Sequence, residues 1–187
     1  MKQLWNLANQ LTLFRLLLVP LILIAMLYGR HGMALGLFLL AAVTDFIDGL
    51  AARRLNQKTT LGAYLDPIAD KLLLSSSFFV QALIGAVPWW VTILVLGRDL
   101  MIVATALVMT LATDLRQFPP SALGKANTAV QIATVFSLVL RNAYPLGWLV
   151  WTAEKLLWVT AAFTLASGAH YAVRTSRRMG RHMPEGH

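Results

Sequence analysis

The chain has 187 residues, of which 58% are hydrophobic and only 13% are charged. This composition is typical of a membrane protein and excludes an ordinary soluble domain. The formal net charge is +8, but the basic residues flank the apolar stretches, so we expect no nucleic-acid binding. Cysteine is absent, which excludes disulfides, thiolate catalysis and cysteine-bound metals.

Six stretches are apolar enough and long enough to cross a bilayer, for which a helix needs about 20 residues. They occupy almost the whole sequence, and we find no repeat or low-complexity linker. We therefore predict an all-α integral membrane protein, folded as one domain over residues 1–187, with short loops. The predicted transmembrane helices are residues 11–28, 34–52, 63–85, 88–112, 123–141 and 147–171.

The N-terminal residues 1–10 place Leu4, Trp5 and Leu7 beside polar neighbours. This pattern favours a short interfacial helix anchored by Trp5, and a frayed terminus is the alternative.

The first span contains Asn9, Thr12 and Arg15 at spacings of three, so the three side chains share one helix face. Arg15 can extend to the membrane surface, or it can face an acidic site or a substrate phosphate. We favour the second interpretation because Asn9 and Thr12 make that face continuously polar.

Four aspartates lie in the segment DFIDGLAARRLNQKTTLGAYLDPIAD, which links two apolar stretches. One carboxylate inside a bilayer costs about 3 kcal/mol on insertion scales, and four together cost on the order of 10 kcal/mol. Pairing with nearby basic residues or solvation explains one or two of them, but bound divalent metal compensates all four. Oxygen-only ligands suit hard cations such as Mg²⁺, Mn²⁺ or Ca²⁺. These aspartates are Asp45, Asp48, Asp66 and Asp70.

The two pairs have helical spacing, with Asp45 and Asp48 three residues apart and Asp66 and Asp70 four residues apart. A short connection makes their helices antiparallel neighbours, so we expect the pairs to face each other near one membrane surface. The four carboxylates share one depth, which argues against the alternative of an ion or proton transporter with acids along a path across the membrane.

Basic residues are distributed asymmetrically, which predicts the orientation because cytoplasmic loops have an excess of Lys and Arg. With both termini inside, the inner segments contain ten basic residues and the outer turns contain two, Arg30 and Arg141. We therefore expect a bacterial cytoplasmic membrane protein with its acidic site on the inner side. The basic tail, residues 174–187, is expected to lie on anionic headgroups.

Polar residues also interrupt the later spans. Arg98 and Asp99 either form an ion pair that offsets its own burial, or Asp99 orients Arg98 to bind a phosphate. Lys125 and Thr128 share a helix face, and Lys125 can alternatively mark the membrane interface.

The acidic segment resembles the signature of the CDP-alcohol phosphatidyltransferase family, D-x₂-D-G-x₂-A-R-x₈-G-x₃-D-x₃-D. The matching residues are Asp45, Asp48, Gly49, Ala52, Arg53, Gly62, Asp66 and Asp70. The resemblance implies a fold of six transmembrane helices, commonly homodimeric, with a two-metal site that uses Mg²⁺ or Mn²⁺. It further implies three metal-binding aspartates, Asp45, Asp48 and Asp66, and a general base, Asp70, that can also contact the second metal.

The same resemblance implies a donor site, and we expect an acceptor site as well. The donor, CDP-diacylglycerol, is expected to lie beside Asp48, Gly49, Ala52, Arg53 and Gly62, with Asn9 and Thr12 close by. The phosphate of the acceptor is expected to lie near Arg98, Lys125, Asn127, Thr128 and Arg15.

Two subfamilies are similar in these motifs: the CMP-forming cardiolipin synthases, which use phosphatidylglycerol, and the phosphatidylglycerophosphate synthases, which use glycerol 3-phosphate. Arg98–Asp99 and the stretch GKANTAVQ resemble the first, because the second more often has R-E and K-x-K-T. Asn127 in place of Lys also removes a cation. That suits a phosphodiester better than a phosphomonoester, whose second pKa is about 6. We therefore expect phosphatidylglycerol as the acceptor, with glycerol 3-phosphate as the alternative.

Overall fold

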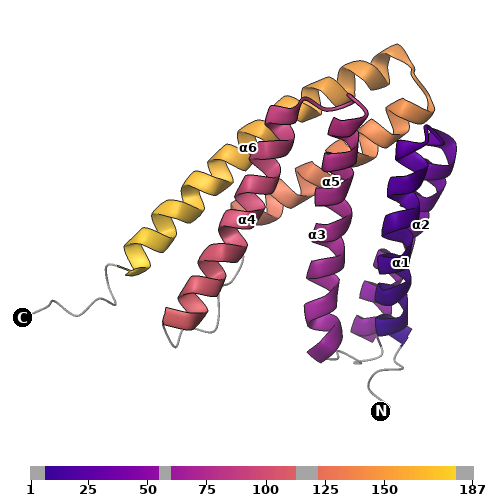
Figure 1. Cartoon of the computed structure of the whole chain (residues 1–187). Helices are drawn as coiled ribbons and strands as arrows, with labels where there is room; N and C mark the ends of the chain where they lie inside the picture. The colour runs from indigo at the N-terminus through magenta and orange to yellow at the C-terminus, as the bar shows by residue number, and fades with distance from the viewer. Residues whose placement is uncertain (1–6, 55–59, 113–121, 180–187) are drawn as a thin grey trace, which may run out of the picture. The chain divides into compact units, whose positions relative to one another are not determined.

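The computed structural model describes residues 7–54, 60–112 and 122–179, and side chains within 10–47, 68–105 and 122–173. In these residues the chain forms six helices and no strand, as predicted (Figure 1). The helices are α1 (Leu7–Leu27), α2 (His31–Arg54), α3 (Thr60–Leu83), α4 (Trp89–Ala112), α5 (Ala122–Ala143) and α6 (Gly147–Met179).

The two ends of the chain differ from the predicted boundaries. The interfacial helix falls mostly on residues outside the described ranges, and Leu7–Gln10 form the first turn of α1. At the other end α6 continues to Met179, through part of the predicted tail. No Pro or Gly interrupts residues 169–179, so nothing in the sequence ends the helix before Gly180.

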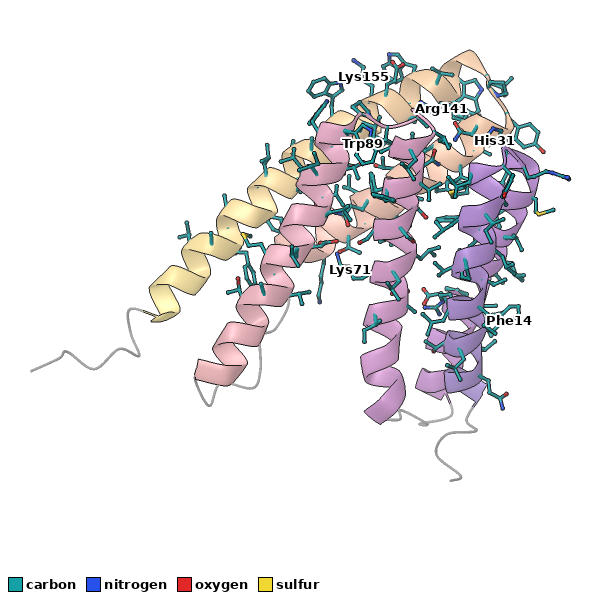
Figure 2. All side chains as sticks on the ribbon, in the orientation of Figure 1. Phe14, His31, Lys71, Trp89, Arg141 and Lys155 are labelled. Carbon is teal, nitrogen blue, oxygen red and sulfur yellow. The ribbon has the colours of Figure 1, made fainter. Side chains whose placement is uncertain are left out.

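Within the described residues, three helices contain stretches that are long and apolar enough to cross a membrane: Gln10–Leu27, Ala122–Ala143 and Gly147–Val173. A shorter apolar stretch, His31–Ile47, lies in α2. Helices α2, α3 and α4 have 24 residues each, or about 36 Å, and they contain most of the charged residues considered above. Large apolar side chains such as Phe14 and Leu17 on α1 are exposed, which suits contact with lipid tails. Figure 2 shows Phe14 on the outer side of α1.

The helices divide into two compact units. The first contains residues 1–87 and 135–153, and the second contains residues 88–134 and 154–187, so α5 and α6 contribute to both. Whether the chain acts as one domain stays a prediction.

In the first unit α1 packs against both α2 and α3. Its core is apolar and includes the fully buried Ile22, Phe78 and Leu138. Two glycines end helices in this unit, Gly29 after α1 (φ +67°) and Gly85 after α3 (φ +73°). At both ends the backbone N–H of the following residue bonds the carbonyl five residues earlier, Arg30 to Ala25 and Ala86 to Gln81, each at 2.8 Å. This is the Schellman arrangement, which requires a residue that tolerates positive φ.

In the second unit α5 and α6 are joined by polar side chains that are fully buried. The hydroxyls of Thr134 and Thr160 lie 2.7 Å apart, and the Thr164 hydroxyl donates to Asn127 Oδ1 at 3.1 Å. Gln131 lies between these pairs on α5, and its side-chain amide has no hydrogen-bond partner in the described residues. Because lipid offers no hydrophobic force between helices, such bonds help determine how they pair.

Replacing Thr134 or Thr160 with Val is expected to lower the free energy of unfolding in mixed micelles by about 1 kcal/mol. Each single change leaves one hydroxyl buried without this partner. The double change should cost less than the sum, since it removes both polar groups. A double-mutant cycle measures the difference, and strictly additive effects would show that the two hydroxyls are not coupled.

Candidate functional site

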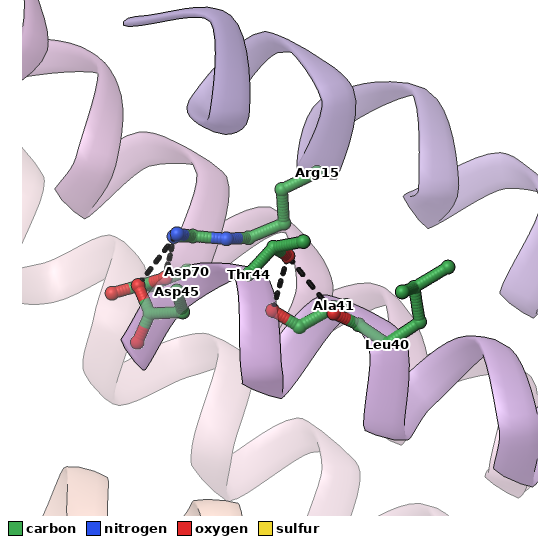
Figure 3. A network of polar contacts seen from close by, with 6 residues as sticks. All are labelled: Arg15, Leu40, Ala41, Thr44, Asp45 and Asp70. Carbon is green, nitrogen blue, oxygen red and sulfur yellow. Dashed lines mark hydrogen bonds and ion pairs between the residues drawn. The ribbon is translucent and has the colours of Figure 1, made fainter. Parts of the chain in front are cut away.

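Arg15 of α1 connects two of the signature aspartates, which come from two other helices. Its Nη2 lies 2.7 Å from Asp45 Oδ1 on α2, and its Nη1 lies 2.9 Å from Asp70 Oδ1 on α3 (Figure 3). One planar guanidinium therefore joins α1, α2 and α3 at a single point. Of the two sequence interpretations of Arg15, the structure shows the one in which the side chain faces the acidic site.

The burial of these three residues is unequal. The side chain of Arg15 is 1% exposed, whereas those of Asp45 and Asp70 are 51% and 48% exposed. Arg15 is therefore packed between the helices, whereas the two carboxylates are accessible to other molecules. A buried guanidinium needs such partners because an unpaired charge in a membrane interior is costly.

Two buried threonines lie next to this cluster, Thr12 on α1 and Thr44 on α2. Thr12, one turn before Arg15, is 1% exposed, so the polar face predicted for α1 points into the unit. Thr44 precedes Asp45, and its hydroxyl bonds the carbonyls of Leu40 and Ala41 at 2.9 and 2.8 Å (Figure 3). Thr44 therefore satisfies its own hydroxyl within α2.

The remaining signature residues lie where no side chain is described. Asp48, Gly49, Ala52 and Arg53 belong to α2, and Gly62 and Asp66 belong to α3. The side chain of Asn9 in α1 is likewise outside the described set. Their predicted roles toward metal and donor stay predictions. Among the side chains that are described, no three acidic or histidine groups gather into a metal-binding cluster.

The donor set of the described part nevertheless fits a hard divalent cation. Asp45 and Asp70 offer only oxygen atoms, and both approach the same cationic group from different helices. Half of each carboxylate side chain is open to further ligands. Such carboxylates suit Mg²⁺ or Mn²⁺, which are bound by a few carboxylates together with water and substrate phosphate oxygens.

In the second unit Arg98 is held by two neighbours. Its Nη1 lies 2.8 Å from Asp99 Oδ1, and its Nη2 donates to Ser167 Oγ on α6 at 2.6 Å. The side chains of Arg98 and Asp99 are only 8% and 11% exposed. The ion pair that the sequence suggested is present, but Ser167 was not anticipated because its sequence position gives no sign that it faces α4.

The predicted acceptor residues of α5 lie on different faces of the helix. Lys125 is exposed, and Thr128 is half-buried with its hydroxyl bonded to the Gly124 carbonyl at 3.2 Å. Asn127 is fully buried against Thr164 instead. Positions two apart project to nearly opposite sides of a helix, so Lys125 and Asn127 cannot approach one ligand atom from the same side.

The described residues form helices with an apolar exterior, and a buried arginine there holds two half-exposed carboxylates. These features define a membrane-embedded protein. The profile of the CDP-alcohol phosphatidyltransferase family matches residues 5–166. The chain belongs to this family, which confirms the resemblance seen in the aspartate signature. It is therefore a transferase of phospholipid biosynthesis, in a family that uses CDP-alcohol and lipid substrates and generally depends on divalent metal.

Three relatives illustrate the similarity. The chain is 38% identical over 182 residues to a probable phosphatidylglycerophosphate synthase of Mycobacterium tuberculosis, covering 94% of this chain and 84% of that protein. It is 34% identical over 188 residues to a CDP-diacylglycerol–glycerol-3-phosphate 3-phosphatidyltransferase of Bacillus subtilis, covering 89% and 93%. It is 31% identical over 191 residues to a CMP-forming cardiolipin synthase of Rattus norvegicus, covering 91% and 63%.

Proposed function

We propose that this protein transfers a phosphatidyl group from CDP-diacylglycerol to a hydroxyl of phosphatidylglycerol, forming cardiolipin and CMP. The observation that supports the transfer chemistry is the cluster of Asp45, Asp70 and Arg15, in which two reachable carboxylates are held by one buried cation. The cluster lies in a membrane-embedded fold, where a lipid donor and a lipid acceptor both have access.

The reaction replaces one phosphorus–oxygen bond with another. The acceptor hydroxyl attacks the lipid-side phosphorus of the donor, the bond to the CMP oxygen breaks, and CMP leaves. Asp70 takes the hydroxyl proton, because its carboxylate is half exposed and its Oδ1 is oriented by Arg15. Arg15 holds the Asp70 carboxylate in position without itself reaching the solvent.

Four aspartates would hold the divalent ions that this family generally requires: Asp45, Asp48, Asp66 and Asp70. When bound, Mg²⁺ or Mn²⁺ supplies charge neutralisation for the pyrophosphate and for the departing CMP. Donor binding is assigned to signature residues and to two residues on the polar face of α1. The signature residues are Asp48, Gly49, Ala52, Arg53 and Gly62, and the residues of α1 are Asn9 and Thr12. We further propose a homodimer in a bacterial cytoplasmic membrane, with the carboxylates toward the cytoplasm.

The acceptor assignment rests on sequence motifs in the second unit. Arg98–Asp99 and the Asn at position 127 resemble the cardiolipin synthase pattern, and Arg98 is held by Asp99 and Ser167 in a fixed orientation. Such a fixed guanidinium can bind one phosphodiester. Lys125 and Thr128 are the other residues proposed for the acceptor phosphate. Arg15, which the sequence suggested for the same role, is buried and bonds Asp45 and Asp70 instead.

A second candidate acceptor, glycerol 3-phosphate, is supported by a specific observation. The two relatives with 38% and 34% identity described above carry names that specify glycerophosphate chemistry. Both candidates share the donor, the carboxylates and the release of CMP, so only the acceptor separates them.

An acceptor competition tests the proposal. The purified protein in mixed micelles receives CDP-diacylglycerol and Mg²⁺ with either phosphatidylglycerol or glycerol 3-phosphate, and CMP and lipid products are quantified. We expect cardiolipin with phosphatidylglycerol and little product with glycerol 3-phosphate. Formation of phosphatidylglycerophosphate would show that glycerol 3-phosphate is the acceptor, and the proposed transfer reaction would otherwise stand. A chain that releases CMP with neither would use another alcohol, and both candidates would be rejected.

A further inference from the structure

A second polar region lies in the first unit, far from Asp45 and Asp70. It is an open cavity of about 510 Å³ lined by the end of α1, the start of α2, the turn after α3 and the α5–α6 turn. Measured along α2, Asp45 lies about 21 Å from His31, at the rim of the cavity. The cavity is therefore near the opposite membrane surface from the carboxylates. Its volume is in the usual range for small-ligand sites, about 300 to 1,000 Å³.

The polar lining of the cavity is basic and amide, with no acid. His31, Arg141 and Asn142 contribute the polar side chains, while Met26, Leu27 and Ile84 contribute apolar ones. Figure 2 shows His31 and Arg141 at the same end of the unit. The acidic residues in the sequence of this unit are only the four signature aspartates. The electrostatic potential in the cavity therefore favours an anion.

Arg141 and Asn142 are positioned by the backbone and side chains around them. Arg141 Nη2 donates to the Ala86 carbonyl at 3.2 Å, in the turn after α3. Asn142 Nδ2 donates to Oε1 of the buried Gln81 at 2.9 Å. These hydrogen bonds connect the end of α5 to the end of α3. They hold the Arg141 guanidinium in a fixed place in the cavity wall. Arginine remains charged and presents several donors to a phosphate.

Aromatic side chains place this end of the unit at the level of lipid headgroups. Tyr28, Tyr144, Trp148 and Trp151 surround the same turns, and each is more than half exposed. Exposed Trp and Tyr concentrate at membrane–water interfaces, where the phosphate groups of phospholipids lie. The cavity is also lined by the apolar side chains of Met26, Leu27, Ile84 and Val150, which acyl chains can contact and a free phosphate cannot.

We propose that this cavity binds the phosphate of an anionic phospholipid from the leaflet opposite the carboxylate site. Arg141 contacts the phosphate, Asn142 and His31 border the headgroup, and the apolar wall contacts the first part of the acyl chains. The same side chains could also bind free inorganic phosphate, so the experiment must distinguish a lipid phosphate from a free one. This site does not depend on the proposed reaction, because its residues lie at the ends of the helices that are far from Asp45 and Asp70.

The test uses photoactivatable phosphatidic acid with a diazirine near the glycerol end of one acyl chain. The full-length protein in neutral-detergent micelles is irradiated, and the labelled peptides are mapped by mass spectrometry. Diacylglycerol with the same diazirine is the control for acyl-chain contact alone. We expect phosphatidic acid to label residues 26–31 and 141–150 about tenfold more than diacylglycerol, the effect of one charge-assisted contact.

Three variants locate the contact. Arg141→Gln is expected to lower labelling of these residues about tenfold. Arg30→Gln removes the same charge from the turn between α1 and α2, at an exposed residue that does not line the cavity, and should leave labelling unchanged. Since Arg141 also bonds Ala86, His31→Glu provides a second variant. It places a carboxylate at the first residue of α2, where an acid suits the helix dipole, and it should repel the phosphate.

Three outcomes would overturn the proposal. The first is equal labelling by the two lipids. The second is unchanged labelling in both Arg141→Gln and His31→Glu. The third is loss of the phosphatidic acid signal when millimolar inorganic phosphate is added, which would identify free phosphate as the ligand. Continued labelling in the presence of inorganic phosphate supports the lipid.

Discussion

Replacing Asp70 with Asn is expected to lower the rate of CMP release by about 10² to 10⁴, the usual contribution of a general base. The amide keeps the size of the carboxyl group and an oxygen that can accept from Arg15, now 2.9 Å from Asp70 Oδ1. It cannot take a proton from the acceptor hydroxyl. The helix packing should therefore survive while the chemistry fails. The measurement is the initial rate of CMP formation at saturating CDP-diacylglycerol and Mg²⁺.

The matched control is Glu154→Gln, which removes one negative charge from an exposed position. It should retain the wild-type rate. Binding of CDP-diacylglycerol, measured separately, should change little in Asp70→Asn, because the loss is in proton transfer. An Asp70→Asn variant within threefold of the wild-type rate would remove Asp70 from the role of base. A variant that no longer binds the donor would show that Asp70 mainly holds the substrate or its metal.

Replacing Arg15 with Gln is expected to lower the free energy of unfolding by about 1 to 2 kcal/mol in metal-free micelles. Gln cannot reach Asp45 and Asp70 together, so two carboxylates of like charge are left without their shared cation. We keep the value small because both carboxylates are half exposed and solvent screens them. Thermal or denaturant unfolding, with Arg30→Gln as the exposed-arginine control, measures the difference.

The same variant should gain more stability from Mg²⁺ than the wild type does. In the wild type Arg15 already neutralises part of the carboxylate charge, so Mg²⁺ should bind less tightly there than in the variant. A ligand that binds only the folded state stabilises it more the tighter it binds, with a logarithmic dependence on affinity. A cycle with Asp45→Asn provides a second check, since removing both partners should cost less than the two single losses added. Equal stability of Arg15→Gln and wild type, together with equal Mg²⁺ effects, would contradict the bridging role.

Some features of the molecule follow from local sequence alone. The apolar stretches predicted six helices because each is long enough to span a bilayer. The spacing of the aspartates predicted which carboxylates share a helix face, because residues three or four apart always lie together on a helix. The same reasoning predicted that Thr12 and Arg15 share one face. The aspartate signature also identified the family.

Other features depend on which helices lie side by side, and the tertiary structure alone decided them. From local spacing alone, the Arg15 side chain could extend to the membrane surface or face an acidic site. Because α1 packs against α2 and α3, it contacts Asp45 and Asp70. Ser167 bonds Arg98 because α6 packs beside α4. Asn127 accepts a hydrogen bond from Thr164 because α5 packs beside α6. The cavity around Arg141 is formed by turns far apart in the chain. Helical periodicity determines which residues share one face, whereas the partner opposite that face depends on how all the helices pack together.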